Sequence, residues 1–207
     1  MRLLPRFAPA LCAGLLALGP GCISYTLDRL PRADDLPPPP APTERPTVSY
    51  TVRMVSGSTF EGDSPEFPEF SPGRLEQEFP AELARCGWFR TVQDNKEGVT
   101  ADLQLDVVLV SRGNDVLLLA SAMLFFIIPT WRTVEFDLTA EVRAADGRWK
   151  RYQLQDASRD VHWLPLLLVM SFAPWGDAYA EVRENLYRTL LVQLHADGFL
   201  QPPIPVP

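Results

Sequence analysis

Two segments of the chain alternate apolar and polar residues with a period of two. In residues 101–110, "ADLQLDVVLV", the odd positions are apolar from Leu103 onward, and in residues 133–143, "TVEFDLTAEVR", the even positions are apolar. A strand places alternate side chains on opposite faces, so the pattern predicts sheet strands with one apolar face and one solvated face. We therefore interpret the acidic residues of both segments as a solvated face and not as paired catalytic carboxylates.

Upstream of these segments the pattern predicts one more strand and a helix. Residues 47–55, "TVSYTVRMV", are rich in β-branched and aromatic residues, which favours a strand. Ser71 followed by Pro72 is typical of a helix start, and apolar residues then recur every four positions. Pro80 predicts a kink or a restart within this helix, and Gly87 predicts its end.

The turn "AADGRW" predicts a hairpin between residues 133–143 and the following "WKRYQLQDAS". A two-residue Asp-Gly turn would place polar side chains opposite apolar ones. A three-residue loop with Gly147 at positive φ instead pairs Val142 with Tyr152 and Ala140 with Leu154. Because a one-residue slip exchanges the faces of a strand, the three-residue loop is the expected one.

A second helix is predicted from about Asp177 to Asp197, where apolar residues recur at helical spacing, and Gly198 ends it. The predicted order is strand, helix, three strands, helix. We expect a single α+β domain over residues 47–200, with a mainly antiparallel sheet of about four strands and both helices on one face.

Two apolar runs interrupt this pattern. Sixteen uncharged residues lie between Asp115 and Arg132, and sixteen more lie between Asp160 and Asp177. As helices they would extend about 24 Å, less than the bilayer's hydrocarbon core of about 30 Å. In an antiparallel sheet both runs leave the same end, opposite the Asp-Gly turn. We therefore expect the domain to have one apolar end.

The apolar runs have three possible roles: a small internal subcore, a groove for a protein partner, or insertion into one leaflet of a membrane. Tryptophans near the ends of the runs suit a lipid interface. The residues predicted to contact a membrane or a partner are Leu118, Leu124, Phe125, Phe126, Trp131, Trp163, Leu167, Leu168, Phe172 and Trp175.

The N-terminus has the layout of a secretory signal: two arginines, an apolar run and then small residues before Cys22. The "LGPGC" at its end resembles a bacterial lipobox, with the small Gly21 directly before Cys22 and the aliphatic Leu18 one position earlier than in the usual pattern. That resemblance implies cleavage after residues 1–21 and lipidation of Cys22. An ordinary signal peptide or a short N-terminal membrane anchor remains the alternative.

The segments outside the predicted domain are rich in proline. Residues 22–46 contain seven prolines between Pro31 and Pro46, which favours an extended tether. The alternative is that this segment packs along the domain as a fixed arm. Residues 201–207, "QPPIPVP", predict an extended tail.

Composition and motifs exclude several classes of function. The net charge is −7, and loss of Arg2 and Arg6 with the signal makes it −9 because residues 1–21 contain no acid. An acidic chain without a basic cluster argues against a nucleic-acid partner and against electrostatic membrane docking. No spacing indicates a metal site, a cofactor or a catalytic residue, and Cys86 is expected to be a buried apolar residue.

"LGPGC", the proline tether, "LARCGWF" and an alternating sheet flanked by apolar runs together resemble small envelope lipoproteins of Gram-negative bacteria. The element order is more remotely similar to the α+β domains of curli-secretion and penicillin-binding-protein-activator lipoproteins. The resemblance implies sorting to the outer membrane, facing the periplasm, because Ile23 and not Asp follows Cys22. It transfers no functional residue and fixes no oligomeric state.

The sequence thus predicts a lipid-anchored envelope protein without catalytic activity that binds a protein partner or the membrane surface. Two alternatives remain. One is an integral membrane protein in which the two apolar runs form a hairpin, and the other is an enzyme of unrecognised type.

Overall fold

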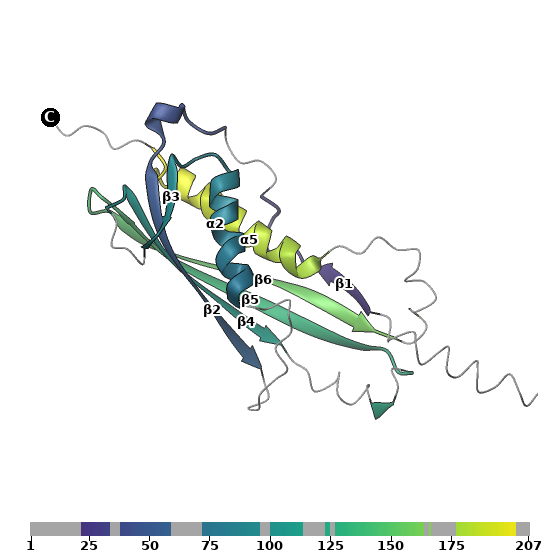
Figure 1. Ribbon diagram of the computed structural model, residues 1–207. Coiled ribbons are helices and arrows are strands. Elements are labelled where there is room, and N and C mark those ends of the chain that lie inside the picture. Colours follow the sequence, from purple (N-terminus) through teal and green to yellow (C-terminus); the bar gives the residue numbers. More distant parts are fainter. Residues whose placement is uncertain are drawn as a thin grey trace, which may run out of the picture.

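The computed structural model describes residues 22–33, 38–58, 72–95, 100–113, 123–124, 127–163, 166 and 177–201 (Figure 1). Its helices and strands, in chain order, are β1 (Cys22–Thr26), the 3-10 helix η2 (Pro42–Glu44), β2 (Thr47–Ser58), α2 (Pro72–Arg85), β3 (Thr91–Asp94), β4 (Leu103–Gly113), β5 (Thr130–Ala144), β6 (Trp149–His162) and α5 (Ala178–Ala196).

The strands form one mixed sheet in the order β1-β6-β5-β4-β2-β3. The pairs β1–β6, β6–β5 and β5–β4 are antiparallel, whereas β2 is parallel to both of its neighbours, β4 and β3. The expectation of a mainly antiparallel sheet of about four strands in the order β-α-β-β-β-α is therefore wrong. The sheet has six strands, and both the strand order and part of the pairing differ from that expectation.

The physical reasons lie at the two edges of the sheet. When a helix crosses over one face of the sheet between two neighbouring strands, the second strand runs parallel to the first. Strand β2, helix α2 and strand β3 form such a unit. Strand β3 has only four residues, all half-buried, so it carries no alternation that would reveal it. Strand β1 has only five residues before the proline-rich segment, too few for a convincing alternation.

The hairpin between β5 and β6 has the predicted faces but not the predicted pairing. Tyr152 and Leu154 are buried on the same side of the sheet as Ala140. Ala140 pairs with Tyr152 and not with Leu154, because the pairing extends to Ala144, whose backbone N–H donates to Arg148 O at 2.9 Å. The three-residue loop is therefore 145–147 and not 146–148, which shifts the register by two residues. A shift of two residues preserves which side chains face the core, so alternation could not detect it. Gly147 has the predicted positive φ, at 88°.

Both helices cover one face of the sheet (Figure 1). Helix α2 packs on β2 and β3, and α5 packs on β6 and β1. Helix α2 continues through Pro80 without the predicted restart. The helices contact each other through the rings of Phe79 and Tyr187, whose centroids are 5.1 Å apart. Gly87 and Gly198 follow the helix ends, as predicted, and both have positive φ.

The core lies between the helices and the apolar face of the sheet. Every inward-facing position of β4 from Leu103 to Leu109, and of β5 from Val134 to Val142, is buried. The alternation predicted for these two strands is thus confirmed. Helix α5 completes this core with a buried stripe that includes Leu186, Leu190 and Leu194.

The first residues of the predicted proline-rich tether pack on the domain. We call residues 22–33 the strap. Strand β1 adds to the edge of the sheet beside β6. Beyond it, the backbone N–H of Arg29 donates to Asp156 Oδ1 at 3.0 Å, and that of Ala33 donates to Asn185 Oδ1 at 3.0 Å. For this part of the segment, the alternative of a fixed arm describes the structure better than a free tether does.

Candidate functional site

The strand ends that border the apolar runs lie at one end of the sheet. Gly113 ends β4, Thr130 begins β5, and Thr130 pairs with His162 at the end of β6. Cys22, the first residue of β1, also pairs with His162. We call this the Cys22 end. It lies opposite Gly147, as the connectivity predicted.

Cys22 is held within the sheet at this end. Its side chain is half-buried, with Sγ 3.8 Å from His162 Nε2 and 4.0 Å from Ser24 Oγ. Ser24 pairs with Asp160, whose side chain is buried beneath the helices, so the same face of β1 carries Cys22. Lipidation of Cys22 stays a prediction, and its position in the sheet is a structural fact that the sequence did not indicate.

Exposed apolar side chains gather at the Cys22 end. Three of the predicted contact residues, Leu124, Trp131 and Trp163, are 50%, 52% and 39% exposed. Three further exposed residues belong to the same run and were not predicted individually: Met123, Ile127 and Ile128. The remaining predicted contact residues, Leu118, Phe125, Phe126, Leu167, Leu168, Phe172 and Trp175, lie outside the described residues.

At the same end, the inner face of the sheet is polar. The buried side chains of Thr130, Arg132, Ser158 and Asp160 occupy sheet positions that are apolar elsewhere on this face, and the buried Tyr179 of α5 belongs to the same group. The Tyr179 hydroxyl contacts Asp160 Oδ2. Among the described residues, Thr130 Oγ1, Ser158 Oγ and Asp160 Oδ1 are buried atoms without a hydrogen-bond partner. We call these five residues the polar cluster.

Burial governs protonation at the polar cluster. Desolvation raises the pKa of Asp160, opposed by a hydrogen bond from Ser24 and by the charge of Arg132. Desolvation also lowers the pKa of His162, and the Arg132 charge lowers it further. The guanidinium of Arg132 packs against Gly113, where a Cβ would lie only 2.9 Å from Nη2. The cluster therefore favours neutral side chains around one buried guanidinium.

The sequence contained a signal for this cluster. Tyr152 and Leu154 are inward positions of β6, and the period of two continues through Asp156, Ser158 and Asp160. The predicted strand stopped near Ser158 because its inward positions became polar. Continuing the period through those residues would have placed three polar side chains on the core face.

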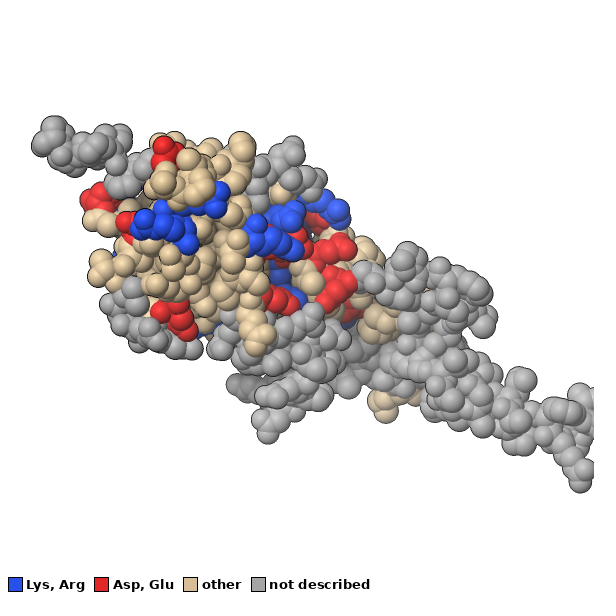
Figure 2. All heavy atoms as spheres, turned by 45° about the horizontal axis from the view of Figure 1, so that its top comes forward, with Lys and Arg blue, Asp and Glu red and all other residues tan. Residues whose placement is uncertain are grey.

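A second set of charges joins the two helices. The buried guanidinium of Arg183 donates to both carboxylate oxygens of Glu78, at 2.8 and 3.2 Å. Arg188 of α5 contacts Glu82 of α2 at 3.3 Å, and Arg85 of α2 donates to Glu184 of α5 at 3.0 Å. Figure 2 shows basic and acidic side chains side by side on this face, without a large surface of one sign. These ion pairs fix the packing of α2 on α5.

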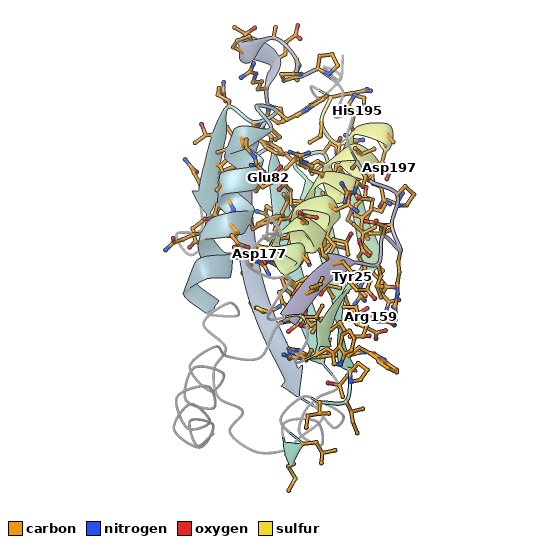
Figure 3. The ribbon with its side chains drawn as sticks, turned by 90° about the vertical axis from the view of Figure 1, so that its right-hand side faces the viewer. Tyr25, Glu82, Arg159, Asp177, His195 and Asp197 are labelled. Atoms are coloured by element: carbon orange, nitrogen blue, oxygen red, sulfur yellow. The ribbon has the colours of Figure 1, made fainter. Side chains whose placement is uncertain are left out.

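The opposite end of the sheet carries an open cavity of about 630 Å³ on the helix-free face. We call this end of the sheet, which carries the turn between β5 and β6, the hairpin end. In Figure 3, His195 and Asp197 mark the end of α5 on the hairpin side, whereas Tyr25 and Arg159 lie toward the Cys22 end. Small alanines line the cavity together with Gln104, Glu141, Arg143, Gly147, Arg148 and Trp149.

Catalytic groups are not evident within the described residues. No cluster of three His, Cys, Asp or Glu side chains there could hold a metal ion. Cys86 donates its thiol to Leu83 O at 3.0 Å, and burial raises its pKa, which makes it a poor nucleophile. The ring of His195 packs edge-on against Trp88, with centroids 4.8 Å apart. The expectation that the chain is not an enzyme stays a prediction.

No family model and no curated protein matches the chain. Among solved structures, a PelC dodecamer from Paraburkholderia phytofirmans is similar over 87% of this chain and 98% of its own chain, with 10% identity and a TM-score of 0.30. Values this low establish neither a shared fold nor a shared function.

Proposed function

We propose that this chain is a lipid-anchored envelope protein, acylated at Cys22, whose Cys22 end lies against the membrane surface. The observation that carries the proposal is that Cys22 and the exposed apolar side chains lie at the same end of one sheet. A lipid on Cys22 would bring Trp131 and Trp163 to the bilayer together with the anchor.

The strap gives this arrangement a defined orientation. A free polyproline tether would let the domain rotate and move away from the membrane. Here Cys22 is paired within the sheet, and the chain after β1 is bonded to Asp156 and Asn185. Because no free residues separate Cys22 from the domain, an acylated Cys22 would hold this end of the sheet next to the lipid.

The chemistry of the Cys22 end suits a lipid interface. Indole rings of the kind presented by Trp131 and Trp163 favour the boundary between headgroups and acyl chains. The net charge, −7 for the whole chain and −9 without Arg2 and Arg6, offers no attraction to anionic lipid, so contact would depend on the anchor and on apolar side chains. No helix among the described residues is both long and apolar enough to cross a bilayer.

The finer parts of the proposal rest on the sequence. The lipobox-like "LGPGC" supports cleavage before Cys22, and Ile23 supports sorting to the outer membrane, with the domain in the periplasm. The proposed binding role without catalysis rests on the sequence, in which no motif or spacing indicates a nucleophile, a base or a metal site. The competing hypothesis is that a protein partner, and not the membrane surface, contacts the Cys22 end.

Anchoring is tested by replacing Cys22→Ser in a chain with a cleavable, non-lipoprotein signal. Carbonate extraction of membranes should release this variant and retain the wild type, and mass spectrometry should find an acylated Cys22 at the wild-type N-terminus. Retention of the variant would instead favour an integral protein. An unmodified N-terminus at another position would contradict lipidation directly.

Membrane contact at the Cys22 end is tested by quenching of tryptophan fluorescence with brominated lipids in proteoliposomes. Replacing Trp131→Phe should reduce the quenched fraction, because this indole lies at the proposed interface. Trp149→Phe, an exposed tryptophan at the hairpin end, is the matched control and should leave the quenched component unchanged. Absence of quenching in the wild type would reject membrane contact and leave a protein partner as the occupant.

A further inference from the structure

The cavity at the hairpin end combines features that the proposed membrane contact does not use. Its volume of about 630 Å³ lies within the range of sites for small molecules, about 300–1,000 Å³. One wall presents Trp149, which is 69% exposed. We infer that this cavity is a saccharide-binding site in which the Trp149 indole is the stacking platform.

Three side chains form a row across the sheet. Gln104 of β4 pairs with Arg143 of β5, and Arg143 pairs with Trp149 of β6. All three face away from the helices, because the neighbouring residues Leu103 and Val142 are buried on the other face. Neighbouring strands are about 4.8 Å apart, so the row extends about 10 Å. That length accommodates a disaccharide lying across the strands.

The row offers the two kinds of contact that a sugar ring requires. The C–H groups on one face of a pyranose are apolar and pack against an indole, while its hydroxyl groups point outward around the rim. Arg143 is a planar donor, Glu141 an acceptor, and the Gln104 amide is both. Arg143 and Glu141 are 3.8 Å apart and partly solvent-exposed, so their hydrogen-bonding capacity is available to adjacent hydroxyls.

The wall of the cavity is held in place before any ligand binds. Arg148 Nε donates to Asp146 at 2.7 Å, and its guanidinium lies over the ring of Phe199, 5.1 Å from the centroid. Its Nη1 also approaches Gly198 O at 3.4 Å. These contacts connect residues 145–148 to the chain after α5. A preformed wall lowers the entropy cost of binding.

Other occupants fit this surface less well. A stable protein interface buries about 800 Å² on each partner around an apolar core, whereas the neighbours of Trp149 in the cavity are small, polar or charged. A membrane would meet the charged side chains of Asp146, Arg148 and Lys150 at this end. A phosphate-like anion would meet the carboxylate of Glu141. A polar ligand with one apolar face matches the cavity best.

The inference stands independently of lipid anchoring. If the proposed function also holds, the hairpin end points away from the membrane, because it is the opposite end of the sheet from Cys22. The binding test uses detergent-purified protein without a bilayer, so its failure would leave the anchoring proposal unaffected.

The test is calorimetric and NMR titration of the full-length protein with three soluble probes: a cello-oligosaccharide, a chito-oligosaccharide and the disaccharide of peptidoglycan. We expect at least one probe to bind with millimolar or tighter affinity, and the preferred probe to indicate the natural source. Trp149→Ala should weaken that binding at least tenfold, and Arg143→Ala severalfold. Trp149→Phe, which keeps an aromatic ring, should have an intermediate effect.

Trp131→Ala is the matched control, since Trp131 is also exposed but lies at the Cys22 end. The affinity of the Trp131→Ala variant for the preferred probe should equal that of the wild type. Failure of all three probes to bind, or equal losses in Trp131→Ala and Trp149→Ala, would overturn the inference. Thermal melts of each variant distinguish lost binding from lost folding, and a folded Trp149→Ala that binds normally would also overturn it.

Discussion

The two halves of β6 present opposite chemistry to the same layer of the protein. Near the hairpin end, Tyr152 and Leu154 are buried in the apolar core. Near the Cys22 end, Asp156, Ser158 and Asp160 are equally buried on the same face of the same strand. The hairpin half is built as an ordinary core, whereas the Cys22 half contains polar groups that are costly to bury.

The difference indicates what each half does. Polar side chains in the Cys22 half bond the strap and the start of α5: Asp156 accepts from Arg29, and Asp160 contacts Tyr179. In the hairpin half, Tyr152 and Leu154 pack in the apolar core, and only the Tyr152 hydroxyl reaches outward, donating to Asp197 Oδ2 at 2.7 Å. Stability should therefore depend mainly on the hairpin half, and the placement of Cys22 mainly on the polar half.

The largest expected effect comes from the apolar half. Leu154→Ala removes a side chain that is 5% exposed and should reduce the free energy of unfolding by about 2–5 kcal/mol. Ser158→Ala, in the polar half, removes a buried hydroxyl without a hydrogen-bond partner and should change it by less than about 1 kcal/mol. Urea denaturation measures both, and equal losses would remove the distinction between the halves.

A smaller loss is expected at the turn of the hairpin. Gly147 has a φ of 88°, where an L side chain is strained although space around the position is open. Gly147→Ala should cost about 1–2 kcal/mol in thermal or urea unfolding. An unchanged stability would mean that the loop adopts another conformation. It would also weaken the case for a rigid wall at the saccharide cavity.

Asp160 gives the Cys22 half a pH dependence. Its folded pKa is raised, mainly by burial, so the folded state holds the proton more tightly than the unfolded state does, whose pKa is about 3.9. Its stabilising contribution is therefore complete at low pH and declines as the pH rises from about 4 through the folded pKa. In Asp160→Asn this decline should disappear.

Unfolding of the wild type and of Asp160→Asn between pH 4 and pH 7 measures this difference. The stability of the variant relative to the wild type should increase with pH. A difference that stays constant or shrinks would show that Arg132 and Ser24, and not burial, control the Asp160 carboxyl group.

The smallest effects on stability are expected at the exposed residues of the two ends. Leu124→Asp and Trp149→Ala should each change the free energy of unfolding by less than about 0.5 kcal/mol, because both side chains are at least half exposed. Leu124→Asp should nevertheless weaken liposome flotation, while Trp149→Ala should not. Strong destabilisation by Leu124→Asp with unchanged flotation would place Leu124 in a closed subcore.

The parts of the fold that sequence could predict are those governed by local periodicity. The alternation in β4 and β5 identifies their buried faces, and glycines mark both helix ends and the hairpin. Which strands pair, and in which register, was harder to predict from the sequence. A two-residue shift in the hairpin leaves every buried position unchanged, and the parallel pairing of β2 depends on where α2 crosses the sheet.

For the candidate site, composition identified the apolar runs, and connectivity correctly placed the strand ends beside them at one end. The position of Cys22 was beyond this reasoning because β1 is too short to carry a convincing pattern and pairs with a distant segment. The row of Gln104, Arg143 and Trp149 was equally hidden. It emerges only from cross-strand register, which determines neighbours that sequence spacing does not.

The pairing of Cys22 with His162 has a consequence for the order of folding. The two residues are separated by 140 positions, so closing that loop costs on the order of 4 kcal/mol in chain entropy. Strand β1 has no strand to pair with until β6 has joined β5. In a chain whose N-terminus is already anchored in a bilayer, β1 would therefore stay unpaired until the rest of the sheet has formed. The first strand of the chain should be the last to join.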